Sequence, residues 1–277
     1  MTMTAQKIEA ETAAKVSGTR PTGARDEREA AARVREMFGH IAPRYDFLNH
    51  LLSFSLDRVW RWSTAKRFRH ILGRPEARVL DICCGTGDLS FALDRMRQSE
   101  LSKSPHQSDG RSFPVIGSDF VEPMLTRARE KAQHSGHAIP FAAADALHLP
   151  FGDASFDLVT TAFGFRNLAN YEDGLREIAR VLKPGGEVGI LEFTEPESGP
   201  MAGIFRFYFQ HILPRIGGII SGNSEAYKYL PGSVAKFPSP PALAALMEKV
   251  GFSGVRFASW NFGSVILHSA RRDTAIR

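Results

Sequence analysis

Cysteine is almost absent from this sequence: its 277 residues include two, Cys83 and Cys84, which are neighbours. Adjacent side chains at the end of a strand point to opposite faces, so the pair excludes a disulfide framework. A metal site would need more ligands at ligand spacing than the chain supplies, so we expect no metal. These absences indicate a reduced, cytoplasmic compartment.

An apolar leader is also missing from the beginning of the sequence. Residues 1–30 mix both charges and lack the apolar core that a signal peptide needs. We therefore expect residues 1–32 to be a disordered tail. The rest, 33–277, has a length that suits one domain with a substantial core.

Acidic residues become scarce toward the C-terminus. The chain has a net charge of +5, and nine Lys or Arg face three acidic residues between 201 and 277. Such an excess suits an anionic membrane surface or nucleic acid, although a solvated face explains it equally well.

No apolar run is long and clean enough to predict a membrane-spanning helix. The most apolar stretch, 203–222, is interrupted by Arg206, His211, Arg215 and Pro214. We expect 203–240 to form a lid or a substrate-covering insertion, with a buried core helix as the alternative.

Apolar periodicity predicts an α/β fold. Residues 33–72 have a helical pattern interrupted at Pro43, and the later segments alternate between strands and helices. The predicted strands are 77–83, 114–119, 139–144, 156–163 and 186–193; the helices are 87–97, 122–134 and 171–182; and a hairpin joins 255–260 to 264–270. We expect a Rossmann-like, mostly parallel seven-stranded sheet with a C-terminal antiparallel hairpin and an N-terminal helical extension at 33–72.

A glycine turn follows the first predicted strand. Gly85 and Gly87 allow close approach of a nucleotide, but Ser90 stands where the dinucleotide fingerprint has its third glycine. Asp81 and Asp88 would repel a pyrophosphate and favour a cationic cofactor such as S-adenosylmethionine. Asp88 has a second explanation as an acid that stabilises the helix dipole.

Two further acidic positions end the second and third strands. A carboxylate after the second strand can accept hydrogen bonds from both ribose hydroxyls, and Asp119 supplies it, with helix capping as the alternative role. Asp145 can accept from the adenine amino group while Ala146 flanks the ring. We predict that these residues, with Gly85 and Asp81, bind the cofactor.

Four motifs between roughly 77 and 195 resemble the class I S-adenosylmethionine-dependent methyltransferases: VLDICCGTGDLS, GSDFVEPMLTRAREKA, ADALHLPF and REIARVLKPGGEV. A narrower resemblance, to the menaquinone and ubiquinone C-methyltransferases, is carried by 38–62, FGFRNLANYEDGLREIARVLKPGG (163–186), LEFTEP (191–196) and YKYLPGSVAKFP (227–238). It implies methylation of a ring carbon of a polyprenylated quinol, either demethylmenaquinol or a benzoquinol precursor of ubiquinol.

The resemblance also implies positions for the cofactor contacts. They fall on Thr86, Asp119, Asp145 and Ala146. Many members have a serine before the FG of the fourth strand, where this chain has Ala162. A hydroxyl contact to the cofactor is therefore expected to be missing or replaced.

The loop after the fourth strand carries the expected catalytic residues. Arg166 can stabilise a phenolate and Asn167 can orient it, while Tyr45 in the extension lines the entrance. Arg166 is a poor proton acceptor, so a base acting through water, Asp145 or His148, is left unassigned. The alternative for Arg166 is a surface ion pair.

Other functions remain open to different degrees. An NAD-linked oxidoreductase is favoured by the glycine turn alone, and a nucleic-acid methyltransferase by the isoelectric point alone. The AFGFRN sequence at 162–167 lacks the Asn/Asp-Pro-Pro-aromatic turn of base amino methylation, so we expect no nucleic-acid partner. A quinol tail would need cover from 203–222, and the basic C-terminal excess would allow peripheral contact with the inner face of the cytoplasmic membrane. Neither the preferred ring nor the oligomeric state follows from the sequence.

Overall fold

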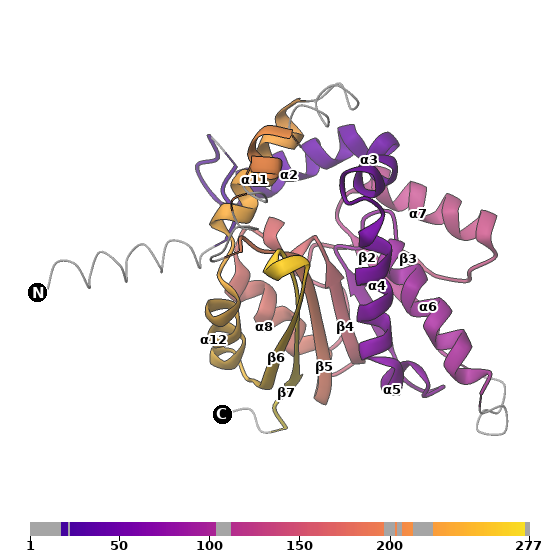
Figure 1. Ribbon diagram of the computed structural model, residues 1–277. Helices are drawn as coiled ribbons and strands as arrows, with labels where there is room; N and C mark the ends of the chain where they lie inside the picture. The colour runs from indigo at the N-terminus through magenta and orange to yellow at the C-terminus, as the bar shows by residue number, and fades with distance from the viewer. Residues whose placement is uncertain are drawn as a thin grey trace, which may run out of the picture.

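A computed structural model describes residues 18–21, 23–103, 112–196, 203, 207–212 and 224–274. These residues form a twisted sheet covered by helices on both faces, with a group of helices across one end (Figure 1). None of the described helices has the length and apolar character needed to cross a membrane.

The sheet has seven strands in the order β3-β2-β1-β4-β5-β7-β6. Its strands are β1 (Val79–Ile82), β2 (Val115–Asp119), β3 (Phe141–Ala143), β4 (Phe156–Ala162), β5 (Leu182–Phe193), β6 (Phe252–Trp260) and β7 (Val265–Arg272). The first five pair in parallel, and β7 pairs antiparallel with both β5 and β6. The predicted fold class, including the C-terminal hairpin, is confirmed.

One strand begins earlier than expected. The Lys183-Pro184-Gly185-Gly186 segment, which reads as a turn, lies within β5. Phe156 pairs with Leu182, and the next pair joins Leu158 to Glu187, so a bulge absorbs the extra residues.

Alternation of side chains along the strands divides the core between the two faces. Val79 and Leu158 pack against α4 (Leu56–Arg67), α5 (Arg69–Leu72) and α6 (Asp88–Leu101). Leu80 and Val159 point the other way, toward α8 (Tyr171–Val181) and α12 (Pro240–Lys249). Helices cover both faces of β1 and β4, which explains why these two strands are mostly apolar runs.

The N-terminal extension begins before residue 33. Helix α2 (Glu27–Ile41) begins inside the predicted tail, and the side chain of Asp26 caps it by accepting from the Glu29 amide. Thr19 is buried, and its amide donates to the Leu168 carbonyl at 2.8 Å. The tail prediction is therefore corrected for the described residues from 18 to 32, because capping and packing order them.

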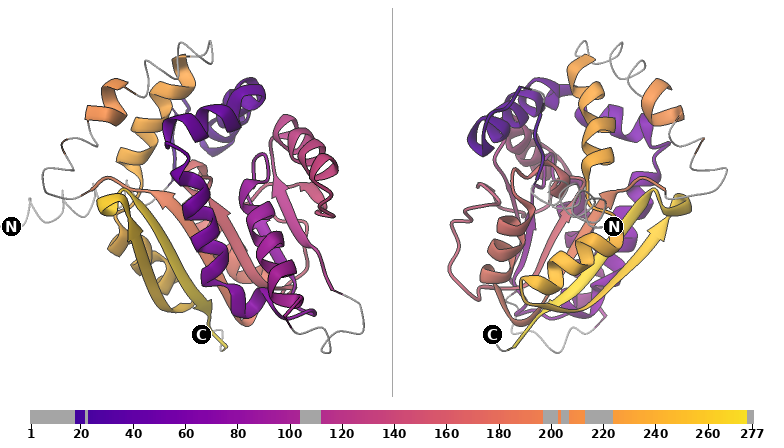
Figure 2. Two further views of the ribbon diagram at one scale, coloured as in Figure 1. Left: turned by 45° about the vertical axis from the view of Figure 1, so that its right-hand side comes forward. Right: turned by 90° about the vertical axis from the view of Figure 1, so that its left-hand side faces the viewer.

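Helices from both ends of the chain meet over the carboxyl edge of the parallel strands: α2, η1 (Ala42–Arg44) and α3 (Tyr45–Leu52) from the N-terminal extension, and α11 (Ser224–Lys236) from the C-terminal part. The helix α7 (Glu122–Ser135), which lies beside β2 and β3, contacts α2 and η1. Figure 2 shows α11 and the extension at the same end of the sheet. Leu230 and Val234 of α11 pack with Ile41 and Leu48 of the extension. The 203–222 part of the expected lid lies mostly outside the described residues; its described helical part is η4 (Tyr208–Ile212).

Candidate functional site

A cavity that is partly open to solvent lies where the extension covers the carboxyl edge of the sheet. Its walls come from the glycine turn after β1, the end of β2, residues 144–147, the loop after β4, and the helices α2, α3 and α4. Ligands of open α/β sheets bind at this edge, where neighbouring loops diverge.

The glycine turn has a left-handed backbone at alternate residues. Cys83, Gly85 and Gly87 have φ of 50°, 54° and 87°. Gly85 lines the cavity, and Gly87 precedes α6, where an added Cβ would lie 3.0 Å from the rings of Phe91 and Phe141. A side chain at Gly87 would therefore be strained in conformation and crowded in space.

Asp81 is buried at the end of β1. It accepts hydrogen bonds from the hydroxyls of Ser90, at 2.6 Å, and Thr160, at 2.9 Å. Burial raises the pKa of Asp81 to about 7. This carboxyl is fixed by its partners and lies beneath the cavity rather than projecting freely into it.

Asp119 occupies the place predicted for a ribose ligand, at the end of β2. Its carboxylate accepts from the amides of Gly85, at 2.8 Å, and Val121, at 2.9 Å. Each oxygen retains a further lone pair for a hydroxyl donor. Burial raises the pKa of Asp119 to about 6. The side chain is thus aimed and desolvated before any ligand arrives.

The predicted adenine contacts follow β3. Asp145 accepts from the Leu147 amide at 2.9 Å, and both Asp145 and the buried Ala146 line the cavity. His148 is exposed, with Nδ1 3.8 Å from an Asp145 oxygen. Among the described lining residues Asp145 is present and His148 is not, which leaves Asp145 as the better placed of the two candidate bases.

The charge of the cavity fits S-adenosylmethionine better than a pyrophosphate. Among the described lining residues, the acidic ones are Asp81, Asp88, Asp119 and Asp145, and the basic one is Arg61. Arg61 and Lys131 compensate Asp88. The other three acids make up an excess of negative charge that attracts a sulfonium and an ammonium and repels phosphates. The oriented Asp119 carboxylate adds a ribose acceptor, so these residues fit the cofactor.

Thr86, predicted to contact the cofactor, is held by the extension. Its hydroxyl donates to Asp46 of α3 at 2.5 Å. Lys131 of α7 donates to Asp46 at 2.8 Å and to Asp88 at 2.6 Å. These bonds clasp α3 to the glycine turn and to α7. Sequence patterns do not predict this clasp, because Asp46, Thr86, Asp88 and Lys131 are contributed by segments far apart in the chain.

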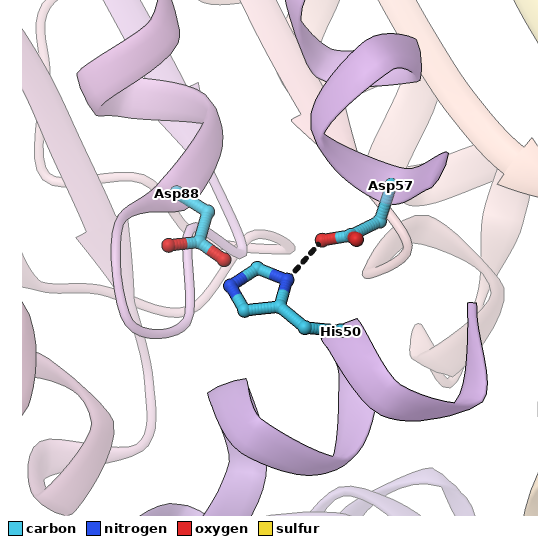
Figure 3. Close-up of side chains that lie close together, drawn as sticks. All are labelled: His50, Asp57 and Asp88. Atoms are coloured by element: carbon cyan, nitrogen blue, oxygen red, sulfur yellow. Dashed lines mark hydrogen bonds and ion pairs between the residues drawn. The ribbon is translucent and has the colours of Figure 1, made fainter. Parts of the chain in front are cut away.

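A second cluster fixes α4 beside the clasp (Figure 3). His50, Asp57 and Asp88 converge, with potential ligand atoms within 4.8 Å of one another. Arg61 pairs with Asp57 and approaches Asp88 at 3.5 Å, and Lys131 also binds Asp88. Because basic side chains already neutralise the carboxylates, the cluster serves as an ion-pair network rather than as a cation site.

Arg166 lies behind the cavity wall. It is buried, and its Nη1 donates to Glu192 at 2.5 Å and to the Phe163 carbonyl at 2.6 Å. The Arg166 amide donates to the other Glu192 oxygen at 3.1 Å. Among the described residues that line the cavity, Arg166 does not appear. Arg166 was predicted to contact the phenolate of the substrate. In the structure its guanidinium is instead paired with Glu192.

Asn167 and Tyr45, by contrast, both line the cavity. The side-chain oxygen of Asn167 accepts from the Tyr229 hydroxyl at 3.1 Å, and Tyr229 lies 3.1 Å from the Thr19 hydroxyl. Burial raises the pKa of Tyr229. Sequence reasoning missed Tyr229 and Glu192 as site residues, although both lie in motifs that carried the resemblance.

Known proteins of similar sequence were found across most of the chain. The chain is 47% identical over 239 residues to "Demethylmenaquinone methyltransferase" of Deinococcus radiodurans, covering 86% of this chain and 92% of that protein. A Thermus thermophilus protein of the same name is 47% identical over 236 residues, covering 85% and 100%. "Ubiquinone/menaquinone biosynthesis C-methyltransferase UbiE" of Geobacter sulfurreducens is 43% identical, covering 88% and 90%.

Solved structures share the fold at low sequence identity. A possible histamine N-methyltransferase from Thermotoga maritima has a TM-score of 0.55 at 18% identity, covering 85% of this chain and 98% of that one. The trans-methyltransferase CalH, solved with SAH, has a TM-score of 0.54 at 14% identity, covering 79% and 59%. The model of the ubiE/COQ5 methyltransferase family matches residues 24–272. The chain therefore belongs to the ubiE/COQ5 methyltransferase family, as its motifs and its cavity predict.

Proposed function

We propose that this S-adenosylmethionine-dependent C-methyltransferase acts on demethylmenaquinol, converting it to menaquinol. The observation that carries the choice of ring is the 47% identity to two proteins named demethylmenaquinone methyltransferase, each alignment spanning at least 85% of the chain. A benzoquinol of ubiquinone biosynthesis is the second candidate, favoured by the UbiE name of the relative at 43% identity. We further propose that the enzyme works in the cytoplasm, at the inner face of the membrane.

The cavity has an apolar region that suits an aromatic acceptor. Val34 and Phe38 of α2, Met124 of α7 and Phe163 after β4 line it together with Tyr45. The rings of Phe38 and Tyr45 meet edge to face with centroids 6.0 Å apart. A flat bicyclic ring can pack among such side chains, while the acidic residues lie on the cofactor side.

Methyl transfer to carbon needs a nucleophilic ring carbon in line with the sulfonium. The cofactor, when bound, supplies the methyl group: the carbon–carbon bond forms as the carbon–sulfur bond breaks, and the ring hydrogen then leaves as a proton. Loss of a quinol hydroxyl proton makes that ring carbon electron-rich. We assign Asn167 and Tyr45 to orientation of the ring oxygens, and Asp145 to proton acceptance through water.

Arg166 has a supporting part in this proposal. Its charge is compensated by Glu192, and its bond to the Phe163 carbonyl fixes the loop that presents Asn167. We therefore treat Arg166 as a positioning residue. Its loss would displace Asn167 while leaving the acidic cofactor side in place.

A competition between acceptors tests the proposal. Labelled S-adenosylmethionine is given with reduced demethylmenaquinone or with the benzoquinol precursor, in detergent and under reducing conditions. We expect faster transfer to the naphthoquinol. Equal or reversed rates would overturn the choice of ring, and transfer to neither would overturn the quinol assignment.

A further inference from the structure

The turn between α3 and α4 presents an unusual number of large apolar side chains to solvent. The exposed ones on these two helices and their turn are Phe47, Leu51, Phe54, Leu56, Val59 and Trp62. Phe54 is 78% exposed and Trp62 is 51% exposed. Single exposed apolar residues are ordinary, but a group along one short hairpin marks an interaction surface.

On α4 and the turn before it, the exposed charges that accompany these side chains are all of one sign, and Asp46 of α3 is paired with Lys131. Within 53–70, the exposed charged residues are Arg58, Lys66, Arg67 and Arg69. Asp57, the acid of this segment, is buried and paired with Arg61. The ammonium of Lys66 also lies 4.9 Å from the ring centroid of Trp62, which joins a basic and an apolar member. We call this set of apolar and basic side chains the α3–α4 face.

The backbone holds the tip of the α3–α4 face outward. Phe54 and Ser55 have φ of 53° and 60°, a left-handed conformation that is unfavourable for residues with a side chain. The Ser55 amide donates to the His50 carbonyl at 2.7 Å, and the Ser53 hydroxyl donates to Asp57 at 2.8 Å. These bonds maintain a turn that keeps a phenylalanine in solvent, which is unfavourable unless something covers it.

The same helices reach the cavity from their other side. Tyr45 of α3 and Arg61 of α4 line it; α3 lies at the covered end of the sheet, and α4 runs from that end along one face of the sheet (Figures 1 and 2). The α3–α4 face is therefore separated from the cavity by the thickness of these helices. If this face lies on another surface, a ligand leaving that surface needs to pass only these helices to reach the apolar part of the cavity.

The basic excess at the C-terminus is less available than its sequence indicates. Arg271 pairs with Glu187, Lys249 pairs with Glu172, and Arg272 donates to the Leu182 carbonyl. The pairs of Arg271 and Lys249 lie at the surface, where these side chains are 67% and 61% exposed, so pairing offsets part of their charge without burying it. Exposed cations such as Lys236 and Arg256 remain there, but they lack a neighbouring group of exposed apolar residues as large as the one on the α3–α4 face.

We propose that the α3–α4 face docks on an anionic lipid bilayer, with Phe54 and its apolar neighbours entering the interface while the basic side chains meet the headgroups. Exposed aromatic and apolar residues flanked by Lys and Arg are the chemistry that binds such a surface. The delivery of a membrane-borne quinol rests on the proposed function; the lipid contact itself does not.

The first test measures flotation with vesicles of phosphatidylglycerol and phosphatidylcholine. The double variant Phe54→Ser/Trp62→Ser is expected to bind about tenfold more weakly for each ring removed. Phe113→Ser is the matched control, because Phe113 is also an exposed phenylalanine but precedes β2, at the opposite edge of the sheet. Equal binding by the double variant and the wild type would overturn the proposal.

The second test compares two charge reversals of equal size. Arg58→Glu/Lys66→Glu alters the α3–α4 face, and Lys236→Glu/Arg256→Glu alters the C-terminal excess. We expect the first to weaken binding about fivefold for each cation lost, and the second to change it little. The reverse order would move the docking surface to the C-terminus and refute our assignment. Stronger binding to purely zwitterionic vesicles would refute the electrostatic part.

The third test separates docking from catalysis. Phe54→Ser/Trp62→Ser should methylate a water-soluble quinol with a truncated tail at the wild-type rate, yet lose activity toward a long-tailed quinol embedded in vesicles. If no quinol is methylated by the wild type, the proposed function fails while flotation still judges the docking. A dimer of the wild type that dissociates in the same variant would show that a second copy covers the face, and would overturn lipid docking.

Discussion

Two buried carboxylates at the carboxyl edge of the sheet differ in how they are satisfied. Asp119, after β2, accepts from two backbone amides and borders the cavity. Glu192, in β5, faces the guanidinium of Arg166. The partners of Asp119 are backbone amides and not a basic side chain, and burial raises the pKa of Asp119 to about 6. The comparison shows that Asp119 keeps acceptor capacity toward the cavity, whereas the protein itself satisfies Glu192.

Of the changes considered, breaking the Arg166–Glu192 pair should have the largest effect on the stability of the protein. Arg166→Ala leaves Glu192 buried without its cation, so we expect the free energy of unfolding to fall by about 3–5 kcal/mol. Chemical denaturation measures it. At permissive temperature the variant should retain cofactor affinity and lose most methyl transfer, since the loop carrying Asn167 is no longer fixed.

A double replacement sharpens this result. Arg166→Met/Glu192→Leu leaves no buried charge without a partner, so we expect it to recover part of the lost stability. Recovery should be incomplete, because the amides of Arg166 and Phe193 lose their acceptor. Turnover should remain low, since the bond to the Phe163 carbonyl is still absent. An Arg166→Ala variant as stable as the wild type would contradict the pairing.

Removing the charge of Asp119 should affect binding rather than folding. Asp119→Asn can still accept one backbone amide, but it loses the anion and an acceptor for ribose hydroxyls. We expect the affinity for S-adenosylmethionine to fall about a hundredfold, measured by calorimetry. Asp153→Asn, an exposed acid that pairs with Arg180, is the control. An unchanged dissociation constant for Asp119→Asn would remove this residue from the site.

The pH dependence of cofactor binding follows from the same carboxyls. Burial raises the pKa of Asp119 to about 6 and that of Asp81 to about 7. A cationic ligand prefers the ionised forms, so affinity should begin to fall about tenfold per unit below pH 7, where Asp81 is protonated, and more steeply below pH 6, where Asp119 is protonated as well. In Asp119→Asn the steeper part below pH 6 should disappear. The stability of the protein without ligand should change in the opposite direction. Because the pKa values of Asp81 and Asp119 are higher in the folded than in the unfolded state, the free energy of unfolding falls as pH rises from about 4 to 7.

The smallest effect is expected at the hydroxyl that touches Asn167. Tyr229→Phe removes one neutral hydrogen bond, so turnover should fall about fivefold with unchanged cofactor affinity. Tyr208→Phe provides a matched comparison, since its hydroxyl donates to the Leu52 carbonyl and not to the catalytic loop. Identical losses in both variants would indicate a general effect on the helices that cover the cavity.

The parts of the site that the sequence predicts are those fixed by local rules. Asp119 and Asp145 follow strands directly, and parallel strands bring their carboxyl ends to one edge, so strand order was enough to place them together. The α2 boundary could have been predicted from Asp26 and Glu29, whose capping signals were overlooked within a polar segment.

The missed features depend on side-chain partners that no local rule supplies. Glu192 of β5 pairs with Arg166 in the loop after β4, so a basic loop residue that was expected at the substrate or at the surface is buried and neutralised. The clasp of Asp46, Thr86 and Lys131 joins three elements. Tertiary packing decides such pairs, and sequence spacing carries no trace of them.

The adjacent cysteines have a consequence for an enzyme that handles redox-active rings. Both thiols line the cavity, where desolvation, together with the nearby Asp119 and Asp81, raises the pKa of Cys83 and of Cys84 well above the usual range. Thiolates add to the electrophilic ring of an oxidised quinone, whereas protonated thiols react slowly. By suppressing ionisation of its own sulfur, the cavity lowers the rate at which the oxidised form of its substrate, which keeps an unsubstituted ring carbon, would alkylate it.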